Sequence, residues 1–198
     1  MKDKVASSQI PESKTVQVNV TVFGGSKPKP GEPDYEAALQ LGRLLGAAGY
    51  AVLTGGYIGT MEAVSRGAAE TGGHVIGVTC DEIESWRPVK PNPWVMEERR
   101  YPALRERMYA LIDNCDAALV LPGGIGTLAE LAAMWSQLQT GASTPRPLIL
   151  IGGGWQTTLN IFYQTLGAYI HEKDLQWLYF VPDVGGASDQ LQSLLPVS

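Results

Sequence analysis

The sequence predicts an α/β protein with a doubly wound, Rossmann-like parallel sheet that is flanked by helices on both faces. Segments with strand and helix patterns alternate along the chain, which favours parallel strands joined by right-handed helical crossovers. The inner strand segments, such as residues 117–121 and 147–151, are apolar throughout, as expected for strands covered on both faces. Three strand segments end in glycine-rich turns. We assign residues 15–198 to one domain, preceded by a flexible polar tail at residues 1–14.

The first half of the chain contains three strand segments with a helix between each pair. Apolar and polar residues alternate over Val16–Phe23, which predicts the first strand. Asp34 is expected to cap a helix that runs through Gly46, and Gly49 ends it. The other elements expected here are strands at residues 50–54 and 74–79 and a helix at residues 60–70.

The second half begins with an irregular stretch, residues 81–93, which contains three prolines and Trp86. Such long connections are usually functional or mobile, but the sequence does not give the role of this one. A short edge strand is expected at Val95–Met96, and Pro102 suits the first turn of a helix that continues to Asn114. The remaining expected elements are strands at 117–121, 147–151 and 177–181, and helices at 126–139, 155–170 and 188–195.

Composition excludes several classes of protein. Hydrophobic residues make up 44% of the chain and charged residues 18%, as in globular proteins. The net charge of −5 argues against non-specific binding to nucleic acid. We expect no membrane segment, because no stretch approaches the roughly 20 apolar residues that a spanning helix needs. Two cysteines and two isolated histidines do not form a zinc or disulfide pattern. We therefore expect a cytoplasmic protein that holds no metal.

The three glycine-rich turns are the candidate ligand site, because the carboxyl ends of parallel strands lie at one edge of a sheet. Glycine lets a ligand approach the backbone, and the helix that follows offers free amide groups to a phosphate. The alternative is that these glycines serve only the shape of the turns. The third turn is the most informative, since it joins a fully apolar strand to a helix. The candidate binding residues are Gly24, Gly25 and Ser26, then Gly55, Gly56, Gly59 and Thr60, then Pro122, Gly123, Gly124, Ile125, Gly126 and Thr127.

Glu130 follows the third turn and shares a helix side with Gly126 and Thr127. Helical side chains lean toward the N-terminus, so its carboxylate points toward the proposed phosphate site from about 5 Å away. At that position it could contact the sugar attached to the phosphate. It could equally be a first-turn acid that only stabilises the helix dipole.

Arg107 falls on the apolar side of the helix after Pro102, three residues after Leu104 and four before Leu111. An arginine on a buried side needs a partner of opposite charge. That partner is either a bound phosphate or a structural carboxylate, and the helical spacing alone leaves both open.

Residues 122–130, PGGIGTLAE, resemble the PGGxGTxxE signature of the LOG (LONELY GUY) family, long labelled as possible lysine decarboxylases. The resemblance covers residues 16 to about 170. Residues 22–26 are similar to the family's opening strand and turn, residues 55–61 to its GGGxxGLM segment, and residues 72–78 to its GGxVIGV segment.

This resemblance implies a phosphoribohydrolase, which cleaves the N-glycosidic bond of cytokinin riboside 5′-monophosphates or of AMP to give a free base and ribose 5-phosphate. It implies that Glu130 and Arg107 are the catalytic pair, and that no cofactor is required. Arg105 and Met108 depart from the family's histidine and lysine, and Glu62 stands where glycine is usual. In Glu62 and in residues 81–93 the chain resembles a sister branch that includes a molybdenum cofactor carrier protein. The alternative is therefore a non-catalytic carrier that binds a phosphate, a nucleotide or a molybdopterin-type ligand.

The chain is also expected to associate with itself, as a homodimer or homotetramer. The resemblance implies this, and so does the helix after the third turn. Its sheet-facing stripe is predicted to be Leu128, Leu131, Trp135 and Leu138, which leaves Ala132, Ala133 and Met134 as apolar surface to cover.

Overall fold

A computed structural model describes residues 17–197, and it contains one seven-stranded sheet in which every pairing is parallel. The strand order is β4-β3-β2-β1-β5-β6-β7. This confirms the predicted doubly wound sheet. The strands are β1 Asn19–Phe23, β2 Ala51–Thr54, β3 Val75–Cys80, β4 Glu97–Tyr101, β5 Ala117–Val120, β6 Leu148–Ile151 and β7 Leu178–Val181.

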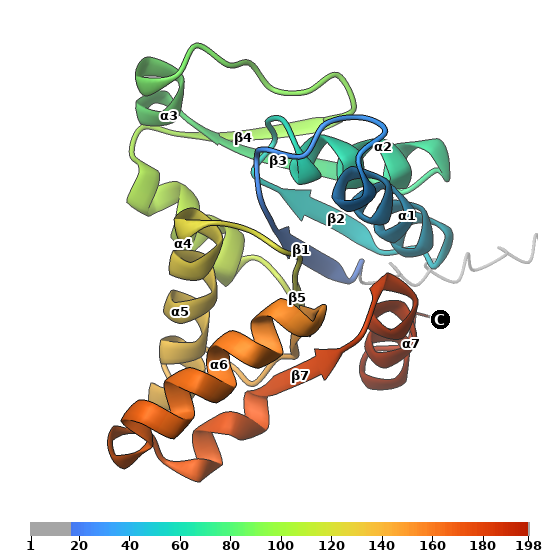
Figure 1. The fold of residues 1–198 in the computed structure, drawn as a ribbon. Helices are drawn as coiled ribbons and strands as arrows, with labels where there is room; N and C mark the ends of the chain where they lie inside the picture. The colour runs from blue at the N-terminus through green and yellow to red at the C-terminus, as the bar shows by residue number, and fades with distance from the viewer. Residues whose placement is uncertain (1–16, 198) are drawn as a thin grey trace, which may run out of the picture.

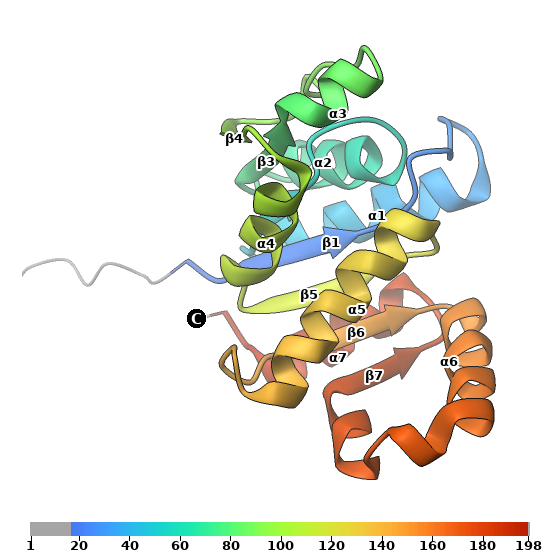
Figure 2. The same ribbon diagram turned by 90° about the vertical axis from the view of Figure 1, so that its left-hand side faces the viewer.

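Helices cover both faces of this sheet, as Figures 1 and 2 show. One core contains buried residues of α1, α2 and α7, such as Leu41, Val64 and Leu191. The other contains residues of α4, α5 and α6, such as Leu111, Leu131 and Leu159. The helices are α1 Pro33–Ala47, α2 Thr60–Glu70, α3 Asp81–Trp86, α4 Leu104–Asp113, α5 Ile125–Thr140, α6 Gly153–Leu166 and α7 Val184–Leu194, with 3₁₀ turns η1 Gly167–Tyr169 and η2 Glu172–Trp177.

The order of the strands reverses at the centre of the sheet. The chain builds β1 to β4 toward one edge and then returns to place β5 on the other side of β1. Ligands of open α/β sheets bind in the crevice outside the carboxyl ends of the strands at such a switch point. The loops after β1 and β5 flank this position, and the loop after β2 is their neighbour.

Two sequence predictions between β3 and α4 were wrong. Residues 81–86 form the helix α3, although the whole stretch 81–93 was expected to be irregular. Its N-terminus is fixed by the Cys80 thiol, which accepts a hydrogen bond from the Ile83 amide, and six residues are too few to show a helical repeat. The edge strand is Glu97–Tyr101, not Val95–Met96. Four of its five residues are charged, a composition that an edge strand tolerates because it has only one neighbour.

Smaller differences concern helix ends and faces. α1 begins at Pro33 after Glu32, with no side-chain cap, so Asp34 lies inside its first turn. On α5, Met134 is fully buried while Leu128 is 38% exposed, so the helix is rotated from the expected orientation. The predicted tail, residues 1–14, lies outside the described residues. Within residues 17–197, no helix is both long and apolar enough to cross a bilayer.

Candidate functional site

Hydrogen bonds join the three glycine-rich turns at the carboxyl edge of the sheet. The Gly25 amide donates to the Pro122 carbonyl at 3.1 Å, which links the loops after β1 and β5. The Gly25 carbonyl accepts from the Thr60 amide at 3.0 Å and from its hydroxyl at 2.9 Å, which links the loop after β1 to α2. The sequence prediction that these turns meet is confirmed. Their role in binding stays a prediction.

The glycines of these turns are of two kinds. A Cβ atom at Gly24 would overlap Thr60, one at Gly55 would overlap the Arg107 guanidinium, and one at Gly123 would overlap Thr127. Gly56 and Gly59 have φ angles of 77° and 74°, in the region that favours glycine. By contrast, a Cβ atom at Gly124 or Gly126 would meet no atom of residues 17–197 within 4 Å, apart from its chain neighbours and its own helix backbone. The space beside the start of α5 is therefore open.

The open space lies at the N-terminus of α5, the longest helix described. The Leu128 amide is bonded to the Gly124 carbonyl, but the amides of residues 125–127 precede the first intrahelical bond. These amides and the positive end of the helix dipole suit an anion. Ile125 extends into solvent, whereas Thr127 is buried with its hydroxyl beside Gly123. A phosphate-sized anion can therefore approach this end of the helix without displacing a side chain.

Arg107 reaches this edge from α4, and its side chain is only 6% exposed. Its Nε donates to the Val78 carbonyl at 2.8 Å, and its Nη1 lies 3.6 Å from Glu130 Oε1. The sequence left its partner open between a phosphate and a carboxylate. The structure supplies a carboxylate, and that carboxylate is the other residue of the candidate pair. Among the described residues, Nε alone donates to the backbone, and Nη2 makes a long contact of 4.0 Å with the Met61 sulfur. The terminal nitrogens can therefore serve Glu130 and a ligand.

Glu130 lies in the second turn of α5, with its side chain 14% exposed. Burial raises the pKa of its carboxyl to about 7, although the Arg107 guanidinium acts to lower it. A carboxyl of this kind exchanges its proton near neutral pH, which is the property of a group that takes part in proton transfer or stabilises developing charge. Its contact with Arg107 is an interaction that a role in the helix dipole would not require, and the choice between the two roles stays open.

Sequence reasoning missed Tyr57, which lies in the loop after β2 with its ring 5.9 Å from the Arg107 guanidinium carbon. The signal that could have identified it is a large aromatic residue within the second glycine-rich turn, where only the glycines and Thr60 were considered as candidates. No cluster of three or more metal-ligating side chains is present in residues 17–197. The expectation that the site needs no metal stays a prediction.

The fold and this edge of the sheet define a Rossmann-like α/β protein with a buried acid–arginine pair beside an open helix N-terminus. The chain belongs to the SLOG cluster4 family, whose model matches residues 17–141. The resemblance to the LOG family is thereby confirmed.

Several curated relatives carry LOG names. The chain is 36% identical over 123 residues to the probable cytokinin riboside 5′-monophosphate phosphoribohydrolase LOGL5 of Oryza sativa subsp. japonica, a match that covers 61% of this chain and 49% of that protein. It is 33% identical over 132 residues to the pyrimidine/purine nucleotide 5′-monophosphate nucleosidase of Escherichia coli (strain K12), covering 61% of this chain and 28% of that protein. The chain thus spans half or less of the length of these two relatives.

Among solved structures, the molybdenum cofactor binding protein from Rippkaea orientalis superimposes with a TM-score of 0.70. It is 22% identical, and the superposition covers 91% of this chain and 98% of that one. The molybdenum cofactor carrier protein from Chlamydomonas reinhardtii gives a TM-score of 0.69 at 23% identity, covering 91% and 99%. These two similarities establish the fold.

Proposed function

We propose that this protein is a phosphoribohydrolase that cleaves the N-glycosidic bond of nucleoside 5′-monophosphates, giving a free base and ribose 5-phosphate. The observation that carries the proposal is the buried pair of Glu130 and Arg107, 3.6 Å apart, beside the open N-terminus of α5. The names of the curated relatives support the same reaction.

In the proposed complex the 5′-phosphate binds to the amides at the start of α5, and the ribose extends toward Glu130, about one helical turn further on. Cleavage leaves positive charge on the sugar ring, which an ionised carboxylate beside C1′ stabilises. The same carboxylate orients a water molecule and accepts its proton as the water oxygen bonds to C1′. The C1′–N bond breaks, and the base leaves with its bonding electrons and takes up a proton.

Arg107 holds the ligand in this proposal. Its terminal nitrogens can donate to the ribose hydroxyls or the phosphate while Nε remains on the Val78 carbonyl. It also favours the ionised form of Glu130, because a cation 3.6 Å away lowers the carboxyl pKa against the effect of burial. The reaction as written uses no cofactor and no metal.

The proposal is tested by incubating the protein with a panel of nucleoside 5′-monophosphates and measuring free base and ribose 5-phosphate by chromatography. We expect equal amounts of the two products from at least one monophosphate. The matching nucleosides are the control, and they should not be cleaved, because the helix N-terminus then has no phosphate to bind. Tight binding of a monophosphate without release of base would contradict the proposal.

That outcome would favour the second candidate, a carrier that binds a phosphorylated ligand such as a nucleotide or a molybdopterin-type compound without turnover. The observation in its favour is Trp86 at the end of α3, which is 80% exposed on the same edge of the sheet. An exposed indole offers a stacking surface for a large heterocycle. The names of the two structural neighbours, a molybdenum cofactor binding protein and a molybdenum cofactor carrier protein, are consistent with this candidate.

We further propose that the protein forms a homo-oligomer through an apolar groove between α5 and α6. The groove has a volume of about 440 Å³ and includes Leu128, Trp135 and Phe162. Helix α6 has no charged residue, and Ile161 on its outer side is 58% exposed. A mostly apolar surface of this kind, in which the acidic lining residue Asp174 is buried, fits a second copy of the same surface, as in the self-complementary interfaces of homodimers.

Light scattering of the wild-type protein tests this association, and a dimer or tetramer is expected at micromolar concentration. Phe162→Asp should shift the population to monomer because it places a charge in the groove, which Phe162 lines. Trp86→Asp, on α3, is the matched control and should leave the mass unchanged. A monomeric wild-type protein would contradict the association. The cytoplasmic location and the absence of nucleic-acid partners stay predictions.

A further inference from the structure

The ring of Tyr57 packs against the guanidinium of Arg107, with 5.9 Å between the ring centre and the Arg107 Cζ atom. A guanidinium within about 6 Å of an aromatic ring is attracted by the electrons of the ring face. The Val78 carbonyl fixes the Nε end of the same guanidinium at 2.8 Å. One contact therefore anchors the Nε end of the side chain, and the Tyr57 ring lies against its guanidinium.

Tyr57 is itself held firmly, with 1% of the residue exposed. Its hydroxyl accepts a hydrogen bond from the Cys80 amide at 2.8 Å. The same hydroxyl lies 3.2 Å from both the Cys80 carbonyl and Glu84 Oε1, either of which can accept its proton. Burial raises the pKa of this phenol, so it remains a donor at neutral pH.

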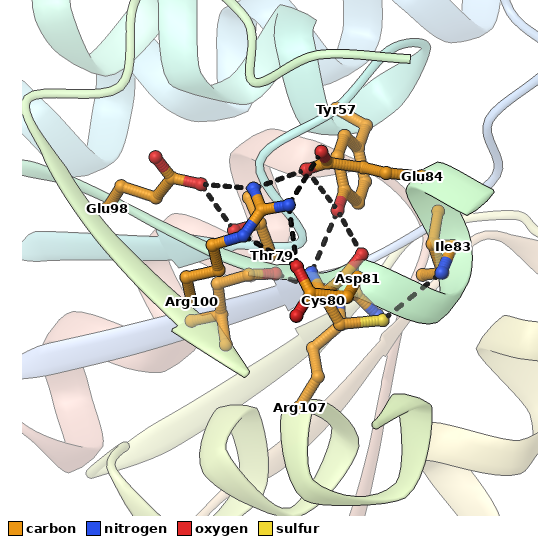
Figure 3. A network of polar contacts seen from close by, with 10 residues as sticks. Tyr57, Thr79, Cys80, Asp81, Ile83, Glu84, Glu98, Arg100 and Arg107 are labelled. Atoms are coloured by element: carbon orange, nitrogen blue, oxygen red, sulfur yellow. Dashed lines mark hydrogen bonds and ion pairs between the residues drawn. The ribbon is translucent and has the colours of Figure 1, made fainter. Parts of the chain in front are cut away.

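The segment between β3 and β4 holds Tyr57 through Glu84, whose carboxylate is fixed in turn by Arg100, as Figure 3 shows. Arg100 on β4 forms two hydrogen bonds of 2.9 Å with the Glu84 carboxylate. The Asn92 side-chain amide donates to the Gly56 and Tyr57 carbonyls at 3.0 and 2.9 Å. The stretch 81–93, whose role the sequence did not reveal, thus braces the loop after β2.

We propose that Tyr57 is a positioning residue, whose ring, braced by Glu84, Arg100 and Asn92, directs the Arg107 guanidinium toward Glu130 and the ligand. The kinetic part of this inference rests on the proposed hydrolysis, but the geometric part concerns the ligand-free protein. If the ring is removed, the guanidinium moves away from Glu130, and the carboxyl loses the cation that favours its ionised form.

The test is the apparent pKa of Glu130 in ligand-free protein, followed by the ¹³C shift of its labelled carboxyl and assigned with Glu130→Gln. Tyr57→Leu should raise this pKa above the value of about 7, by about one unit, because a lost cation disfavours the carboxylate. Tyr57→Phe keeps the ring and should change the pKa less. Tyr50→Leu removes an equally buried tyrosine from the core that contains α1, α2 and α7, and it should leave the pKa unchanged.

Turnover provides the second readout. Tyr57→Leu should lower kcat about tenfold in the wild-type background, and it should have no further effect in Arg107→Ala, because both changes act through one group. Equal Glu130 pKa values in Tyr57→Leu and Tyr57→Phe would overturn the inference. A shift in pKa in a protein that releases no base from any monophosphate would overturn the hydrolysis and leave the positioning intact.

If Tyr57→Leu does not fold, pentafluorophenylalanine at position 57 replaces it, with phenylalanine there as the control. The two rings have nearly the same shape, but fluorination removes the negative face that attracts a cation. The fluorinated ring should raise the Glu130 pKa relative to phenylalanine. An unchanged pKa in this pair would overturn the inference.

Discussion

The loops after β2 and β5 have similar glycine-rich sequences, but they differ in what surrounds their glycines. In the loop after β2, the space beside Gly55 is filled by Arg107 and Met61, and Gly59 approaches the backbone of the loop after β1. In the loop after β5 and the first turn of α5, the space that a side chain of Gly124 or Gly126 would occupy holds no atom of the described part of the chain. The first loop therefore uses glycine to pack protein against protein, and the second leaves room for a ligand. A glycine pattern alone does not separate these two uses.

The largest expected effect is that of Glu130→Gln, which keeps the size of the side chain and removes its charge. Turnover should fall by about 10²–10³-fold, the usual scale for losing one preorganised electrostatic group. Binding of the monophosphate should survive or improve, because a carboxylate near the phosphate is gone. Steady-state kinetics and calorimetry measure the two effects separately. Unchanged turnover would reduce Glu130 to a helix-dipole residue.

Gly55→Ala tests whether the loop after β2 must leave space for the Arg107 side chain. The added methyl group collides with the end of a flexible side chain, Arg107, so the protein should fold while the guanidinium is displaced from its place. We expect turnover to fall about 100-fold and binding to weaken, as for Arg107→Ala, since a ground-state contact is also lost. Kinetics like those of the wild-type protein would show that the position of Arg107 is not critical.

Thr127→Ala tests the loop after β5 as the phosphate site, through a buried residue at the start of α5. The expected loss is about 1–3 kcal/mol in AMP binding, the contribution of a hydrogen bond to a charged group. Calorimetric titration of the variant measures it. Unchanged affinity would place the phosphate elsewhere, with the loop after β2 as the next candidate.

The smallest effect on the fold is expected for Gly126→Ala, the matched counterpart of Gly55→Ala. This glycine lies in the first turn of α5 and has open space around it, so alanine should leave stability unchanged or raise it by about 0.5–1 kcal/mol. Phosphate binding should nevertheless weaken, because the methyl group fills the ligand's space. Thermal unfolding measures the stability of the variant, and calorimetry measures its affinity for phosphate. Stronger phosphate binding would contradict the claim that the ligand occupies the space beside Gly126.

The sequence predicted the architecture because short, fully apolar runs such as Leu148–Ile151, alternating with longer helical patterns, are typical of inner parallel strands. It did not predict β4, since Glu97–Tyr101 is charged and its strand conformation depends on pairing with β3. Helical spacing identified Arg107 and Glu130 as two separate candidates. Spacing could not predict the contact between them, because Arg107 lies on α4 and Glu130 on α5. Tyr57 was missed for the same reason, because its partners Cys80 and Glu84 lie more than twenty residues away. Met134 was placed on the wrong face of α5, where helical period alone did not fix the rotation.

The pH dependence of kcat for base release tests the central claim most directly, because the ionised carboxylate of Glu130 is the acting form. Its pKa is raised to about 7, so kcat should fall about tenfold per unit as the pH drops below 7 and should level off above it. The substrate phosphate itself ionises near pH 6. Glu130→Gln is therefore the control, and it should lack the limb near pH 7. A wild-type kcat that is constant from pH 5 to 9, or that rises as the pH falls, would contradict the account.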